Sequence, residues 1–272
     1  MSLLDDILSE KRSQLEAIRQ LSGPFAPREV RSLLHRRDHE PLRLAAEIKF
    51  KSPSAGALSI VLSLEERALL YAAAGVQLIS VLCDERFFGG SLSHLSRVRT
   101  ALETAGHEAR VLAKEFVIDQ AQIRAAASMG ADAVLLIVRI LTPAELASMT
   151  ALALALGIEP IVEIVDEREL ELAVQVRARV VGVNARDLDT LQMDPSRAER
   201  VLAAIPEGVV AMHLSGLREA IDVTKVARGR ADAALMGEAL MRCDDPRPLL
   251  DEIARAALVS RAGASSDMSS SW

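Results

Sequence analysis

Eight short apolar runs, separated by stretches with helical periodicity, recur along the chain from residue 42 onward. Several of the runs are rich in Val and Ile, which is typical of strands that are buried on both faces. Because parallel neighbours in a sheet need a crossover between them, this alternation predicts a (β/α)8 barrel. The eight runs cover residues 44–50, 78–83, 110–116, 133–138, 159–165, 180–185, 209–214 and 233–237.

An open, doubly wound sheet is the structural alternative to a barrel. It would usually have fewer strands, and no G-x-G-x-x-G motif follows the first apolar run. Residues 3–20 have an amphipathic helical pattern, and residues 28–37 have a second, shorter one. We therefore expect a helical extension at 1–40, a barrel at 41–258, and a flexible, Ser-rich tail at 259–272.

Charge and composition argue against several classes of function. The chain has 32 basic and 38 acidic residues and only 3% aromatic residues, so we expect no nucleic-acid binding. Its two cysteines have no metal-ligand spacing and are too few for a disulfide framework. A membrane span needs about 18 apolar residues in a row, and no apolar run here is that long. The N-terminus lacks a signal-peptide pattern. We expect a cytoplasmic protein that binds neither metal nor membrane.

Ionisable and amide side chains stand near the carboxyl ends of strands that should otherwise be apolar. Glu47 and Lys49 are two residues apart, so they share a face, while Lys114, Glu163 and Asn184 hold similar places in later strands. Taken singly, each could be a solvated boundary residue or half of a structural ion pair. Alternate residues of a barrel strand face inward, and barrel enzymes hold their active sites at this end. Together the residues predict a proton-transfer site at the barrel mouth.

Glycine turns follow the last two predicted strands. They are Ser215-Gly216 and Gly237-Glu238. In (β/α)8 enzymes, the loops at these two places form the common phosphate site, because glycine lets backbone N–H groups approach the oxygens closely. An ordinary tight turn is the alternative for either glycine alone. The segment 49–54 adds cations and hydroxyl groups, and we predict that the loops bind a phosphate group.

Over roughly residues 3–250, the chain resembles the indole-3-glycerol phosphate synthase family. The E-I-K-x-x-S-P-S pattern in the first matching segment is highly specific. The matching segments are AEIKFKSPSAG (46–56), SVLCDERFFGGS (80–91), LAKEFVIDQAQI (112–123), GADAVLLIVRIL (130–141), VEIVDERELELA (162–173), GVNARDLDTLQMD (182–194) and ADAALMGEALMRCDDP (231–246).

The resemblance implies a (β/α)8 barrel with an N-terminal helical extension over its mouth, and no metal or organic cofactor. It implies closure of 1-(2-carboxyphenylamino)-1-deoxyribulose 5-phosphate to indole-3-glycerol phosphate, with loss of CO2 and water. By resemblance, Lys114 is a general acid and Glu163 the general base. Lys49, paired with Glu47, binds the substrate carboxylate and assists proton transfer.

The resemblance also assigns the residues that hold the substrate. Asn184 and Arg186 orient the substrate and the catalytic side chains. Leu214 and Ser215 occupy substrate-contacting positions of the family. The anthranilate ring rests against Phe116, Leu135 and Ile137, and the phosphate contacts fall on Ser52, Gly216, Gly237 and the backbone of Glu238. The expected partner is this small phosphosugar-anthranilate molecule, and we expect a monomer or a weak homodimer.

The sequence departs from the family at the end of the seventh strand. Family members usually read Ser-Glu-Ser-Gly or Ala-Glu-Ser-Gly, whereas this chain has Leu214 in place of the glutamate. The neighbouring His213 is out of phase with the inward residues and should face the helices. Lesser departures are Cys83 for a usual threonine and Glu115 for a usual aspartate. Leu214 therefore leaves a second interpretation open, in which the protein is an impaired homologue that binds phosphorylated anthranilate compounds with little turnover. Another phosphosugar enzyme, such as phosphoribosylanthranilate isomerase, would not need the E-I-K-x-x-S-P-S pattern.

Overall fold

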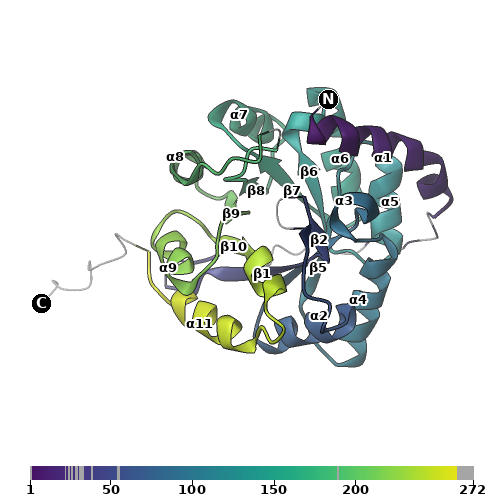
Figure 1. Cartoon of the computed structure of the whole chain (residues 1–272). Helices are drawn as coiled ribbons and strands as arrows, with labels where there is room; N and C mark the ends of the chain where they lie inside the picture. The colour runs from purple at the N-terminus through teal and green to yellow at the C-terminus, as the bar shows by residue number, and fades with distance from the viewer. Residues whose placement is uncertain are drawn as a thin grey trace, which may run out of the picture.

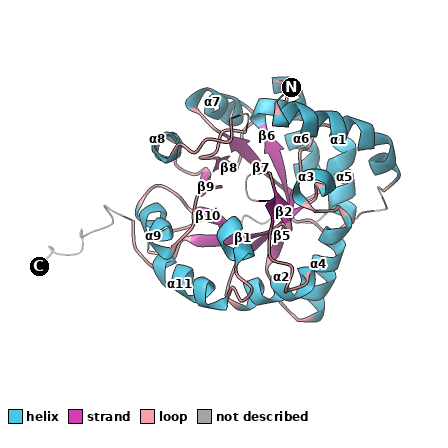
Figure 2. Ribbon diagram, viewed as in Figure 1, coloured by secondary structure: helices cyan, strands magenta, loops and turns pink. Residues whose placement is uncertain are grey.

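Eight parallel strands close into a barrel inside a ring of helices (Figures 1 and 2). This computed structural model describes residues 2–261 except 22, 24, 26, 28–29, 31–33, 38, 54–55 and 189. The predicted barrel is confirmed and the open sheet is excluded, because the first strand pairs with both the second and the last. In chain order, the strands are β1 (Arg43–Ile48), β4 (Leu78–Leu82), β5 (Arg110–Lys114), β6 (Ala133–Ile137), β7 (Glu159–Ile164), β8 (Val180–Val183), β9 (Val210–His213) and β10 (Ala233–Met236).

The predicted strands continue one or two residues beyond the observed carboxyl ends. Lys49, Phe116 and Asn184, for example, follow the last paired residue of their strands. Their side chains line the cavity at the mouth of the barrel. After β1, a small hairpin of β2 (Lys51–Ser52) and β3 (Gly56–Ala57) continues the chain above the barrel wall.

Helices follow the strands and are fixed at both ends by local sequence. Ser63, Asp119 and Thr142 each cap a helix with a reciprocal capping box. Gly75, Gly106, Gly130 and Gly157, predicted to end helices, have positive φ angles. The helices are α2 (Leu64–Ala73), α3 (Glu85–Phe88), α4 (Ser93–Thr104), α5 (Gln120–Ser128), η1 (Val138–Ile140), α6 (Pro143–Ala155), α7 (Glu167–Gln175), α8 (Pro195–Ala204), α9 (Ala220–Arg228), α10 (Glu238–Arg242) and α11 (Arg247–Ala257).

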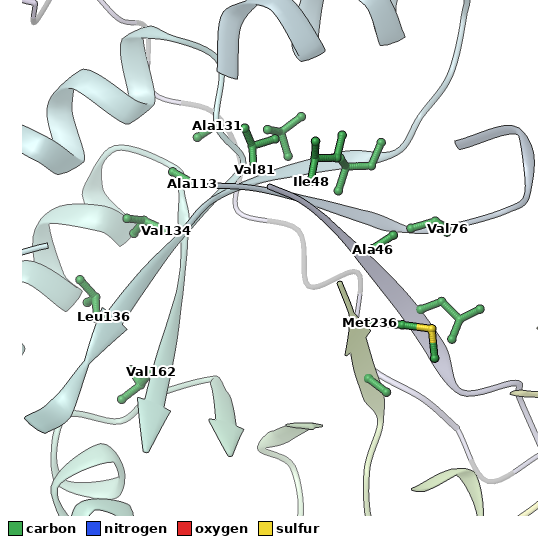
Figure 3. Packing of buried hydrophobic residues seen from close by; sticks show 14 of the residues in the cluster. Ala46, Ile48, Val76, Val81, Ala113, Ala131, Val134, Leu136, Val162 and Met236 are labelled. Carbon is green, nitrogen blue, oxygen red and sulfur yellow. The ribbon is translucent and has the colours of Figure 1, made fainter. Parts of the chain in front are cut away.

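Alternation along each strand divides the buried residues into two layers. Val134, Leu136 and Val162 belong to the layer between the strands and the helices (Figure 3). Leu135 and Ile161, in the intervening positions, fill the inside of the barrel together with residues of other strands. Ser80 and Glu159 are buried polar residues at inner positions, but the rest of this layer below the mouth is apolar. The polar groups predicted at the strand ends gather at the mouth.

The N-terminal segment begins with α1 (Leu3–Gln20), which Figure 1 shows in purple beside α3 and α5. Ser2 and Asp5 form its capping box, and Arg19 Nη2 pairs with Asp119 Oδ2 at 3.1 Å. The second helix predicted at 28–37 falls partly outside the described residues, and its described residues are not helical. The predicted tail lies outside the described residues from 262 onward. No helix in the described part of the chain is long and apolar enough to cross a membrane.

Candidate active site

All the predicted site residues line two adjoining cavities at the carboxyl ends of the strands. The first cavity contains Glu47, Lys49, Ser52, Lys114, Phe116, Leu135, Ile137, Glu163, Asn184, Arg186, Leu214, Ser215 and Glu238. Gly216 and Gly237 line the second, which shares Glu47, Lys49, Arg186, Leu214, Ser215 and Glu238 with the first. The topology thus brings together residues that lie far apart in the sequence.

Two lysines and two glutamates form a buried ionic network in the first cavity. Lys49 Nζ lies 2.6 Å from Glu47 Oε1. Lys114 Nζ lies between the two carboxylates, 4.0 Å from Glu47 Oε2 and 3.7 Å from Glu163 Oε2. Burial opposes ionisation of Glu47, but Lys49 and Lys114 outweigh it, and the pKa of Glu47 is lowered. Glu47 is therefore ionised at neutral pH, and each carboxylate has a proton donor beside it.

Glu163 is held by a chain of hydrogen bonds that starts in the loop after β9. The Asn184 amide Nδ2 donates to Glu163 Oε1 at 2.9 Å. The Asn184 carbonyl accepts hydrogen bonds from the Ser215 hydroxyl at 2.6 Å and from the backbone N–H of Arg186 at 3.0 Å. Since the backbone N–H of Arg186 can only donate, it requires the carbonyl oxygen on that side and fixes the amide with its donor towards Glu163. Ser215 therefore positions Asn184, which in turn positions Glu163.

Leu214 faces the first cavity, in the position where family resemblance leads one to expect a glutamate. It packs closely on Gly182: a Cβ atom added to Gly182 would lie 2.5 Å from Leu214 Cδ1. Arg186 lines the same cavity, and among the described residues no carboxylate lies within 4.0 Å of its guanidinium. His213 points to the other side of the wall, as predicted, into a separate cavity between α8 and α9. Burial there lowers the pKa of His213 to about 4.

Two glycines line the second cavity at positions where a side chain would be crowded or strained. A Cβ atom on Gly237 would lie 2.6 Å from Glu47 Oε1. Gly216 has a φ of +93°, which favours glycine, and a Cβ atom there would meet Met193 Cε at 2.5 Å. Arg218, which the sequence reasoning did not identify, also lines this cavity. The charged lining of this cavity is mixed, with the cations Lys49, Arg186, Arg218 and Arg242 and the carboxylates Glu47, Glu219, Asp222 and Glu238. An anion would therefore bind where the glycine backbone and the cations are nearest.

The resemblance implies a helical extension over the barrel mouth, but it did not identify the residues that roof the first cavity. Leu3, Leu4 and Ile7 of α1 line it, and Phe88 lies beside Phe116 with ring centroids 6.0 Å apart. The amphipathic pattern of 3–20 was the available signal, but it did not say which partner the apolar face meets. The result is a pocket with an apolar side suited to a flat ring and a charged side suited to proton transfer.

Metal ligation was not expected, and that expectation remains a prediction. In the segments that the structure describes, no group of three or more His, Cys, Asp or Glu residues could hold a metal ion. The chemical capacity of the site lies in the four ionisable groups, the Asn184 amide and the Arg186 guanidinium.

Comparisons with known proteins agree with this geometry. The model of the indole-3-glycerol phosphate synthase family matches residues 4–253. Indole-3-glycerol phosphate synthase of Opitutus terrae is 37% identical over 250 residues, 92% of each chain. The Micrococcus luteus protein of the same name is 37% identical over 96% of this chain and 100% of its own. The Paenarthrobacter aurescens protein, also of that name, is 41% identical over 79% of this chain and 77% of its own.

Among solved structures, a 3-hexulose-6-phosphate synthase superposes with a TM-score of 0.63. It covers 79% of this chain and 99% of its own, at 20% sequence identity, and so supports the barrel fold alone. The family match and the relatives above 30% identity, by contrast, extend over most of the sequence, and the family match includes all the predicted site residues. The chain belongs to the indole-3-glycerol phosphate synthase family.

Proposed function

We propose that this protein converts 1-(2-carboxyphenylamino)-1-deoxyribulose 5-phosphate into indole-3-glycerol phosphate, CO2 and water, and is therefore a carboxy-lyase. The observation that carries the proposal is the placement of Lys114 Nζ between the carboxylates of Glu47 and Glu163, at 4.0 and 3.7 Å. This network lies between an apolar pocket that fits the ring and a glycine-walled cavity that fits the phosphate.

The first step joins the ring to the sugar chain. The ring carbon that bears the carboxylate attacks the ketone carbon, and Lys114 donates a proton to the ketone oxygen, which becomes a hydroxyl group. Loss of CO2 then returns the electron pair of the broken C–C bond to the ring and restores its aromaticity. A positioned proton donor of this kind typically contributes about 10²–10⁴-fold to the rate.

The second step forms the double bond of the new ring. The hydroxyl group leaves as water after receiving a proton from an ammonium group, and Glu163 removes a proton from the neighbouring carbon. Asn184 and Ser215 hold Glu163 in place for this transfer through their 2.9 and 2.6 Å hydrogen bonds. Lys49, buried against Glu47, is placed to bind the substrate carboxylate until CO2 departs.

The remaining predicted residues bind the substrate in this proposal. Phe116, Leu135 and Ile137 form the ring pocket. Arg186 and Leu214 border the ribulose chain. Ser52, Gly216, Gly237 and Glu238 hold the phosphate. Nothing in the comparisons supports the alternative of an impaired homologue that binds without turnover. We further propose that residues 1–40 act as an extension of the barrel at 41–258, and that the protein works in the cytoplasm as a monomer or weak homodimer.

A direct assay tests the proposal. Purified protein is incubated with the substrate, and formation of the indole product is followed by its fluorescence. We expect multiple turnovers by the unaltered protein and loss of most activity in Lys114→Ala. Lys225→Ala, which removes an exposed lysine outside both cavities that form the site, is the matched control and should keep full activity. A full rate in Lys114→Ala would refute the assignment of Lys114, and no product with any protein would refute the function.

A further inference from the structure

Lys11 carries a buried positive charge that the proposed reaction does not use. The residue is 1% exposed, and its Nζ lies 2.8 Å from Asp84 Oδ2. It also lies 3.0 Å from Oε1 and 3.1 Å from Oε2 of Glu115. Asp84 and Glu115 are themselves buried. Removing one member of such a buried group leaves the others as uncompensated charges, so the three positions are strongly coupled.

Of the two carboxylates that bind Lys11, Glu115 lines the first cavity, and Asp84 caps α3, whose Phe88 lines that cavity. Glu115 directly follows Lys114 at the end of β5, and its Oε1 accepts the backbone N–H of Phe116 at 2.7 Å. The chain on either side of Glu115 therefore carries the proposed general acid and a wall of the ring pocket. Asp84 caps α3 by accepting the backbone N–H of Phe87 at 2.7 Å.

On α1, Lys11 shares a face with the residues that roof the first cavity. Leu4, Ile7 and Lys11 are separated by three and four residues, which places them one above the other along the helix. Leu4 and Ile7 are buried and line the cavity that contains Lys114. Lys11 thus lies where the apolar stripe of the helix would otherwise continue. It pairs with Asp84, which follows β4, and with Glu115, which follows β5.

We propose that Lys11 is a positioning residue, which holds α1 closed over the ring pocket and fixes the end of β5 that presents Lys114 and Phe116. The inference rests on the proposed function, since it concerns binding of the ring-bearing substrate. The Lys11 ammonium group stays charged in this surrounding. Burial disfavours the Lys11 ammonium, but Glu115 and Asp84 outweigh it and its pKa is raised.

Loss of the cation should make roof closure depend on pH. Gln14 of α1 lies 3.4 Å from Lys11 Nζ, and Cys83 lies beside Asp84, with burial raising the pKa of its thiol. Among the described residues, Lys11 is the one cation that pairs with Asp84 and Glu115. Burial already raises the pKa of Glu115. Without Lys11, two buried carboxylates would face each other, and closure would require that one of them be protonated.

The test compares kcat and KM of Lys11→Met with those of the unaltered protein between about pH 6 and 8. We expect kcat/KM of the variant to fall about tenfold to a hundredfold, the range for a site displaced by about an ångström. Most of the loss should lie in KM and should grow as the pH rises. Lys11→Arg, which keeps the charge, should recover activity, and adding Glu115→Gln to Lys11→Met should remove the pH dependence.

Arg19→Met is the matched control, because it removes another cation of α1 whose ion pair with Asp119 is exposed. Its kcat/KM should stay within about twofold of the unaltered value. If Lys11→Met keeps normal kcat/KM and a normal pH profile and loses only thermal stability, Lys11 is an anchor and the inference is wrong. Should Lys11→Met fail to fold, the double variant with Glu115→Gln decides: it lacks the ion pairs of Lys11, so its KM should be raised at every pH, and an unchanged KM overturns the inference. Activity of the unaltered protein separately tests the proposed function.

Discussion

Replacing Asn184 by Asp is the sharpest test of how Glu163 is held. The two side chains have the same shape, so the change replaces only the Nδ2 donor by an oxygen. Asn184 is buried, and its carbonyl remains occupied by the Ser215 hydroxyl and the Arg186 N–H at 2.6 and 3.0 Å. The new oxygen would therefore face Glu163 Oε1 at about the 2.9 Å of the lost hydrogen bond.

Two effects reduce the rate in this variant. A hydrogen bond to a charged group is worth about 1.5–3 kcal/mol, so losing the Asn184 donor corresponds to about 10- to 150-fold. In addition, two carboxylates at this distance in a buried site cannot both ionise, so one carboxyl group keeps its proton near neutral pH. We expect kcat at pH 7 to fall about 10²-fold, with the rising limb of the pH–rate profile displaced by about one pH unit or more towards higher pH.

Steady-state kinetics across pH, followed by product fluorescence, measure both effects. Ser215→Ala is the graded control: it removes the neutral hydrogen bond to Asn184, worth about 1 kcal/mol, and should cost only about fivefold. The Arg186 N–H, which also donates to the Ser215 hydroxyl at 3.2 Å, keeps its hydrogen bond to Asn184. If Asn184→Asp loses activity by the same factor at every pH, the residue does not act through Glu163. If it loses none, the relay has no part in the reaction.

Three further changes probe other parts of the molecule. Leu214→Glu should raise both kcat and KM several-fold, because the new carboxylate restores a polar group beside the substrate and pairs with Arg186. Unchanged kinetics would place position 214 outside the site. Gly216→Ala should raise KM about tenfold with little effect on kcat, since the φ of +93° is strained for alanine and the loop faces the phosphate; competition by inorganic phosphate measures this. The lowered pKa of His213, about 4 against an ordinary 6.5, means that the unfolded chain takes up the proton first as the pH falls. The free energy of unfolding should therefore fall by about 2 kcal/mol from pH 7 to pH 5 in urea titrations, and His213→Asn should remove this loss.

The sequence predicts the barrel and its mouth well because both depend on local patterns. Runs of Val, Ile and Ala mark the strands, and glycines with positive φ mark the helix ends. Glu47, Lys49, Lys114 and Glu163 stand out because a charge in a buried strand needs a partner. Once the strands form a closed barrel, their carboxyl ends meet at one mouth, so the convergence of these charges follows from the topology alone.

Contacts between distant parts of the chain could not be predicted in this way. Lys11 and Glu115 are 104 residues apart, and nothing in the local pattern of either segment identifies the other as its partner. The helix at 3–20 was predicted from its apolar stripe, but the same stripe fits many surfaces, so only the family resemblance indicated its place over the barrel mouth. Arg218 was missed for a similar reason: it lies in a loop whose path depends on the strands around it.

The exchange of glutamate for Leu214 alters the charge balance of the site more than its shape. The first cavity is lined by three cations, Lys49, Lys114 and Arg186, and by four carboxylates. Glu115 is paired with Lys11 and Glu238 with Arg242, which leaves Glu47 and Glu163 opposite the three cations. A glutamate at 214 would offset the third cation, whereas Leu214 packs on Gly182 and leaves Arg186 without a carboxylate partner among the residues described. The substrate of the proposed reaction brings a carboxylate and a phosphate. A site with an unpaired guanidinium should bind these anions more tightly and hold them in one orientation less strictly, since the extra attraction acts in the ground state as well as in the transition state. The cost of Leu214 should therefore fall on kcat, and a low KM should accompany it.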